Sequence, residues 1–142
     1  MSKIRKTWIM VLALLLLGAH FSLTALVPLQ DGDPAPPWWV GGMLLWPFSE
    51  DTNTFLSEET TNTITPLLSI TSGLCLLLAA AALLRWRVRA NWFSWLVVAG
   101  SGLSIVLQVI WFTGWAILPL AVDAVLLWTV FRMKFTVEDI RG

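Results

Sequence analysis

The sequence predicts an all-α integral membrane protein, built as an antiparallel bundle of four transmembrane helices. Three observations lead to this prediction: the composition is strongly apolar, the uncharged segments have the length of membrane spans, and the positive charges are segregated along the chain. Hydrophobic residues make up 57% of the 142 positions and charged residues only 13%, whereas soluble domains are about 45–50% apolar and about 25% charged. Apolar side chains that face lipid need no polar cover, so a membrane accounts for this composition.

Long uncharged segments define the spans. Residues 7–30 and 60–84 carry no charge, and residues 90–131 carry only Asp123. A helix rises 1.5 Å per residue and needs about 20 residues to cross a bilayer core of roughly 30 Å, so the first two segments give one span each and the third gives two. Thr65-Pro66 predicts the N-cap and first-turn proline of the second span. The single membrane domain (1–142) is expected to have spans at 7–28, 65–85, 92–112 and 115–131, an outer loop at 29–64 and a tail at 132–142.

The charged residues predict the orientation of these spans. The outer loop 29–64 contains six acidic residues and no basic one, and every basic residue lies on the other side. The positive-inside rule therefore predicts a multi-pass protein of the cell membrane (plasma or inner membrane) with cytoplasmic N- and C-termini. The apolar stretch of the first span exceeds the 7–15 residues of a signal peptide, so we expect an uncleaved anchor. The nine basic residues are Lys3, Arg5, Lys6, Arg85, Arg87, Arg89, Arg132, Lys134 and Arg141.

The outer loop contains an apolar segment with three tryptophans, Trp38, Trp39 and Trp46. The segment, residues 36–48, is too short to cross a bilayer, and its prolines and paired glycines disfavour a long helix. Indole rings favour the headgroup region of a membrane. We expect an interfacial lid that lies over the bundle, with a docking surface for a partner protein or a gate for a substrate as alternatives.

Four polar residues in the predicted spans form a candidate site for a ligand or a proton. His20, Ser72, Gln108 and Asp123 come from four different spans, and each falls roughly 9–12 Å below the outer surface at 1.5 Å per residue. An ionised carboxylate inside a bilayer costs on the order of 2.5–3.5 kcal/mol, so Asp123 is expected to face the bundle and find a partner.

Three interpretations of this site are open. His20, Gln108 and Asp123 hydrogen-bond one another and lock the bundle, or they line a small cavity that takes a proton or a small ligand such as a quinone-like head group. In the third, Asp123 pairs with a cation on a partner subunit. Small and polar residues also recur at helical spacing and predict helix–helix seams. These are Ser69, Ser72 and Cys75 in the second span and Ser94, Ser101, Ser104 and Gln108 in the third, where Gly100-Ser101-Gly102 suggests a packing notch.

The sequence contains no motif for catalysis, for a metal or for a cofactor. One intramembrane aspartate excludes a two-aspartate protease, one histidine excludes an H-E-x-x-H zinc site, and one cysteine, Cys75, excludes an internal disulfide. We therefore expect a non-enzymatic protein with no cofactor and no metal.

The expected partners are the lipid bilayer and either other membrane protein subunits or a second copy of the chain, and no nucleic acid is expected. The short basic segment at residues 85–89 is suited to contact with anionic lipid headgroups. The leading hypothesis is an accessory or scaffolding subunit of a membrane complex. The alternative is a small transporter, or a ligand- or proton-binding membrane protein, that uses the buried polar site around Asp123.

Overall fold

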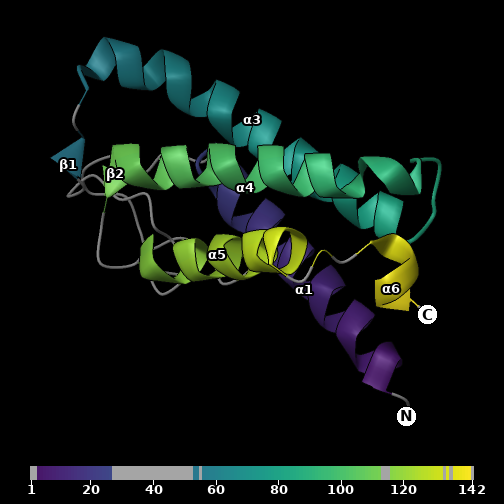
Figure 1. Ribbon diagram of the computed structural model, residues 1–142. Helices are drawn as coiled ribbons and strands as arrows, with labels where there is room; N and C mark the ends of the chain where they lie inside the picture. Colours follow the sequence, from purple (N-terminus) through teal and green to yellow (C-terminus); the bar gives the residue numbers. More distant parts are fainter. Residues whose placement is uncertain are drawn as a thin grey trace.

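The computed structural model describes residues 3–26, 53–54, 56–112, 116–132, 134 and 136–141, and this part of the chain is mostly helical (Figure 1). Three of its helices are long and apolar enough to cross a membrane, and a fourth apolar helix, α5, is shorter. The prediction of an all-α protein is confirmed at this level. The elements are α1 (Lys3–Thr24), β1 (Asn53–Thr54), α3 (Glu58–Leu83), η2 (Ala90–Trp92), α4 (Phe93–Ile110), β2 (Trp111–Phe112), α5 (Ile117–Phe131) and α6 (Val137–Arg141).

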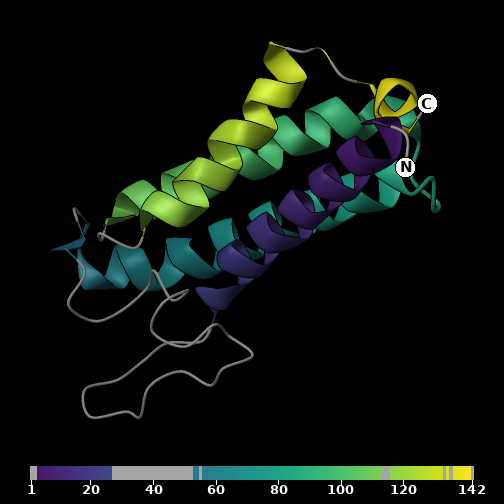
Figure 2. The same cartoon turned by 90° about the horizontal axis from the view of Figure 1, so that it is seen from below.

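The four apolar helices α1, α3, α4 and α5 pack as a bundle. α3 packs against α1 and α4, and α5 packs against α4 and, less extensively, against α1. Both chain termini and the turn between α3 and α4 lie at one end of the molecule, and β1 and β2 lie at the other (Figures 1 and 2). Close contact depends on glycines: a Cβ added at Gly100 of α4 would lie 2.8 Å from Leu76 Cγ of α3. One at Gly73 of α3 would lie 2.6 Å from Leu23 Cγ of α1.

The second predicted span begins earlier than expected. α3 starts at Glu58, and its N-cap is Ser57, whose Oγ accepts a hydrogen bond from the Thr60 N–H at 3.4 Å. The predicted N-cap, Thr65, is therefore wrong, and Pro66 lies inside the helix rather than in its first turn. The polar residues of the first turns are compatible with a helix because threonine hydroxyls can bond to the carbonyl four residues earlier.

A short antiparallel strand pair closes the end of the bundle opposite the termini. Asn53 pairs with Phe112 and Thr54 with Trp111, so the segment before α3 is joined to the end of α4. Trp111 also donates its Nε1–H to Thr65 Oγ1 at 2.9 Å, which links α3 to the same corner. The predicted lid residues Trp38, Trp39 and Trp46, with most of the predicted outer loop, lie outside the described residues.

The C-terminal tail forms a short helix that packs on the bundle. Val137 and Ile140 of α6 are fully buried in the same core cluster as residues of α1 and α3. The Thr136 N–H donates to Asp139 Oδ2 at 3.0 Å, and the Asp139 N–H donates to Thr136 Oγ1 at 3.3 Å, which is the reciprocal pattern of a capping box. The Thr136 backbone and hydroxyl bonds hold the pKa of Asp139 below its ordinary value of 3.8.

Candidate polar site between α4 and α5

One face of α4 carries three buried polar side chains. Ser101, Ser104 and Gln108 are three and four residues apart, which places them on the same side of a helix with 3.6 residues per turn. Ser101 and Gln108 have no exposed surface, and Ser104 is only 1% exposed. This face of α4 is therefore polar although it lies in the interior.

Asp123 of α5 lies against this face. The two helices are antiparallel, and Asp123 is the seventh residue of α5 while Ser104 is the seventh from the end of α4, so the two residues are level. The Asp123 carboxylate is fully buried, and the hydroxyls of Ser104 and Ser101 lie close to it. We call Ser101, Ser104, Gln108 and Asp123 the Asp123 cluster.

The polar atoms of the Asp123 cluster have no hydrogen-bond partners within the described part of the chain. This holds for both carboxylate oxygens, both serine hydroxyls, and the amide oxygen and nitrogen of Gln108. A buried polar group without a partner costs about 1–3 kcal/mol, and more when it is charged. Native proteins usually satisfy such groups with water, protons or ligands. Ser104 and Ser101 approach the Asp123 carboxylate without meeting the geometry of a hydrogen bond, so the four side chains retain donors and acceptors for water, a proton or a ligand.

The four predicted site residues are distributed over two places in the structure. Gln108 and Asp123 both belong to the Asp123 cluster. Ser72 belongs to another group: its Oγ donates to the Gly100 carbonyl at 2.8 Å and forms a 2.9 Å hydrogen bond with Ser22 Oγ. His20 is half-buried on α1, with its ring centroid 6.2 Å from that of Phe21. The hydrogen bonds among His20, Gln108 and Asp123 that one interpretation required are not formed by Gln108 or Asp123.

Ser101 and Ser104 were not predicted as members of the site. Their spacing from Gln108 predicts only a helix–helix seam. The hydrogen-bonded seams are instead those of α3. Ser72 of α3 donates to the Gly100 carbonyl of α4, and Ser69 of α3 donates to the Ser22 carbonyl of α1.

The donor set of the Asp123 cluster consists of a carboxylate, two hydroxyls and one amide. These groups accept or donate hydrogen bonds through oxygen and amide nitrogen, and they suit a proton, water or a small polar ligand better than a soft metal ion. Among the described residues, no group of three or more His, Cys, Asp or Glu side chains could hold a metal ion.

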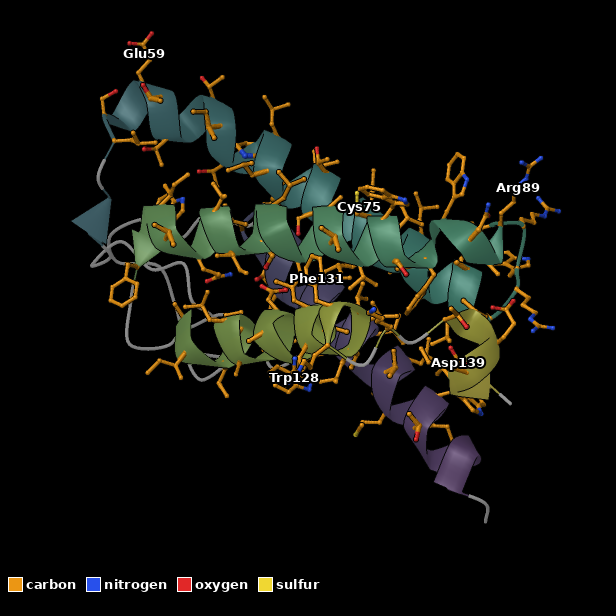
Figure 3. All side chains as sticks on the ribbon, in the orientation of Figure 1. Glu59, Cys75, Arg89, Trp128, Phe131 and Asp139 are labelled. Carbon is orange, nitrogen blue, oxygen red and sulfur yellow. The ribbon has the colours of Figure 1, made fainter. Side chains whose placement is uncertain are left out.

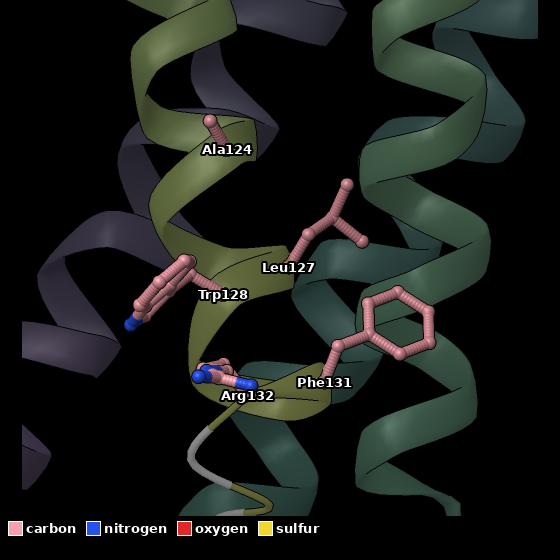
Figure 4. Close-up of a pocket in the computed structure, with 5 residues that line it drawn as sticks. All are labelled: Ala124, Leu127, Trp128, Phe131 and Arg132. Carbon is pink, nitrogen blue, oxygen red and sulfur yellow. The ribbon is translucent and has the colours of Figure 1, made fainter.

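Two of the grooves on the described surface of the bundle lie along α5 and near the end that is predicted to be cytoplasmic. One, of about 390 Å³, lies along the last turns of α5 and is lined by Ala124, Leu127, Trp128, Phe131 and Arg132 (Figure 4). The other, of about 460 Å³, lies at the turn between α3 and α4.

No protein-family model matches this sequence, and no curated protein or solved structure is significantly similar to it.

Proposed function

We propose that this chain is a multi-pass protein of the cell membrane, with α1, α3, α4 and α5 crossing the bilayer and both termini in the cytoplasm. The outward faces of the helices support the proposal. Trp95 is 77% exposed, Leu67 62% and Ile117 67%, and many smaller apolar side chains lie beside them. In water such a surface is strongly unfavourable, whereas in lipid it is matched by its surroundings.

The distribution of charge supports the proposed orientation. Arg89 lies at the end of the molecule that holds the termini, whereas Glu59 lies at the opposite end of α3 (Figure 3). Three cations, Arg85, Arg87 and Arg89, lie in the turn between α3 and α4, at the same end as the termini. A cytoplasmic location for this end satisfies the positive-inside rule. The 15 residues of α5 are about 22 Å long, which is less than the roughly 30 Å of a bilayer core, and such a mismatch is accommodated by local thinning, by snorkelling of flanking residues or by oligomerisation.

We infer that the Asp123 cluster gives this bundle a non-enzymatic binding function, in which the cluster takes up a proton or a small polar ligand. The single observation that carries this inference is the set of buried polar atoms without partners. A cluster that served only to hold helices together would gain most by satisfying its own hydrogen bonds, as Ser72 does between α3 and α4. The unsatisfied groups instead favour a molecule or proton that enters from outside the chain.

The test compares Asp123→Asn with the wild-type protein, because asparagine keeps the shape of the side chain but cannot be ionised. The purified proteins are first analysed by mass spectrometry for retained small molecules. They are then reconstituted into vesicles that contain a pH-sensitive dye, and proton entry is followed after a potential is imposed. Glu59→Gln is the matched control, since it removes an exposed carboxylate at the end of α3.

The proposal expects either a retained molecule or proton entry in the wild type, lost in Asp123→Asn and kept in Glu59→Gln. Two results would overturn it. The first is a folded wild type with no retained molecule and no proton entry above that of empty vesicles. The second is an Asp123→Asn protein that behaves like the wild type.

A second candidate function is an accessory or scaffolding subunit of a membrane complex. The observation that favours it is the groove on α5, where Trp128 is 59% exposed and Phe131 63% exposed beside Leu127 (Figure 4). Exposed aromatic side chains beside a hollow are typical anchors for a partner helix. Purification in mild detergent followed by mass spectrometry tests this function. A stoichiometric partner lost from Trp128→Ala supports it, and a protein that travels alone contradicts it.

A further inference from the structure

The groove at the turn between α3 and α4 combines two arginines with an apolar wall. It is lined by Leu78 of α3, by Arg87, Val88 and Arg89 of the turn, by Trp92 at the end of η2, and by Leu96 in the first turn of α4. Leu78 lies more than one helical turn before the end of α3, and Leu96 lies in the first turn of α4. The apolar part of the groove therefore extends from the turn towards the middle of the bundle.

The backbone of the turn is held in an unusual conformation. The Trp86 N–H donates to the Ala81 carbonyl at 2.8 Å and the Arg85 N–H to the Ala82 carbonyl at 3.0 Å, which is a Schellman motif. Its left-handed position is normally glycine, but here it is Arg85, with φ of 56°, and Arg87 follows with φ of 58°. Left-handed conformations are unfavourable for residues with a Cβ. Arg85 and Arg87 thus occupy two positions whose left-handed backbone conformation glycine would adopt at a lower free-energy cost.

The arginines of the turn have different surroundings. Arg85 approaches Glu138 of α6, with 4.0 Å between Nη2 and Oε1. Arg87 and Arg89 form no ion pair within the described part of the chain, and the Arg89 side chain extends away from the end of the hairpin (Figure 3). The groove therefore has two guanidinium groups without anionic partners beside its apolar wall.

We propose that this groove binds one anionic phospholipid of the cytoplasmic leaflet. The phosphate lies between Arg87 and Arg89, because a guanidinium group donates paired hydrogen bonds to phosphate oxygens. An acyl chain follows Leu78 and Leu96 into the bilayer, and Trp92 lies at the level of the headgroups, which indole rings prefer. The proposal uses the membrane placement proposed above but not the Asp123 cluster.

Charge complementarity identifies the occupant. A zwitterionic lipid offers the same acyl chains but also a cationic group that the two arginines repel. A soluble phosphate offers the anion but leaves the apolar wall of Leu78, Val88 and Leu96 uncovered. Only an anionic lipid matches both parts of the groove.

The experiment measures lipid binding to the purified full chain by native mass spectrometry. Phosphatidylglycerol and phosphatidylcholine with identical acyl chains are added at equal concentrations, and the one-lipid complexes are counted. The double variant Arg87→Gln/Arg89→Gln removes the two cations of the groove. Arg132→Gln/Lys134→Gln is the matched control, because it removes two exposed cations that do not line this groove.

We expect a preference of about tenfold or more for phosphatidylglycerol in the wild type and in the control, and less than about threefold in the double variant. Equal binding of the two lipids by the wild type overturns the proposal without any variant. An equal loss of preference in the control also overturns it, because the effect would then come from total charge. Flotation with vesicles tests the membrane placement separately. A protein that floats with vesicles but binds both lipids equally contradicts only the lipid site, whereas a protein that does not float contradicts the membrane placement.

Discussion

Replacing Gly100 with alanine tests how closely α3 and α4 approach each other. A Cβ at this position would lie 2.8 Å from Leu76 Cγ, 2.9 Å from Leu76 Cδ2 and 3.1 Å from Cys75 Cβ. Leu76 is fully buried, and its Cδ1 would already lie 3.1 Å from a Cβ at Gly18 of α1. The leucine is thus held between two glycines and has little room to move.

Gly102, two residues further along α4, supplies the internal reference. A Cβ at Gly102 would meet no atom within 4 Å. Exchange of glycine for alanine inside a helix stabilises it by about 0.5–1 kcal/mol, and this gain applies at both positions. Insertion of a methyl group into a packed core costs about 1–3 kcal/mol, and this cost applies only at Gly100. Gly100→Ala is therefore expected to be less stable than Gly102→Ala by about 1–3 kcal/mol, or about five- to 150-fold in the unfolding equilibrium.

The assay is equilibrium unfolding of both variants in mixed micelles with increasing denaturing detergent, followed by tryptophan fluorescence and circular dichroism. Gly102→Ala is expected to unfold at a detergent fraction equal to or above that of the wild type, and Gly100→Ala at a clearly lower fraction. If the two variants unfold together, α3 and α4 do not approach each other at Gly100, and the reasoning from this contact is refuted.

Three further predictions concern hydrogen bonds made by individual side chains. Ser72→Ala removes the bonds to Ser22 and to the Gly100 carbonyl and is expected to lower stability by about 0.5–1.5 kcal/mol in the same unfolding assay, an effect that Ser72→Thr should partly restore. Trp111→Phe keeps the aromatic ring but removes the donor to Thr65 and is expected to cost about 1 kcal/mol, and an unchanged midpoint would contradict that bond. Because the folded-state pKa of Asp139 lies below 3.8, its contribution is present above about pH 5 and is lost as the pH falls through 3.8 to the folded-state value. The protection factors of the α6 amides, which are corrected for the intrinsic pH dependence of exchange, should therefore be smaller at pH 3 than at pH 6, and Asp139→Asn should remove this difference.

The sequence predicted the helices better than it predicted their ends. Span length and apolar composition depend on local chemistry, so the apolar helices appear close to the predicted positions. The start of α3 was missed because the acidic and threonine-rich residues after Ser57 were read as loop, although their side chains can cap and bond within a helix. The pairing of β1 with β2 joins residues far apart in the sequence, which no local pattern indicates.

The candidate site was predictable only in part. Counting residues from the ends of the spans placed Ser72 and Gln108 at one depth, but Ser72 bonds to Gly100, which is eight residues, or about 12 Å, from Gln108 along α4. The side of the helix on which each residue lies decides its partners, and this depends on how the helices are rotated against each other. Ser72 faces Ser22 and Gly100, whereas Gln108 lies on the face of α4 that meets α5.

The short helix α6 could have been recognised from its ends. Thr136 and Asp139 are three residues apart, which is the spacing of a capping box, and this signal is present in the sequence. The burial of Val137 and Ile140 could not be predicted, because it requires the surfaces of α1 and α3. A five-residue helix has little stability of its own, so packing against these surfaces must supply most of it.

The seams that α3 forms with α1 and α4 differ from the seam between α4 and α5 in whether their buried polar groups form hydrogen bonds. On the side of α3 and α1, the hydroxyl groups of Ser22, Ser69 and Ser72 all form hydrogen bonds, and close glycine contacts accompany them. That side already locks the helices together by the means that membrane proteins commonly use. On the side of α5, the equally buried groups of the Asp123 cluster form none within the described part of the chain. Apolar side chains of similar volume at these positions would avoid the cost of burying polar atoms. Hydrogen bonds within the described bundle do not account for a buried carboxylate at this position, and the binding function proposed for the cluster would supply a reason for it.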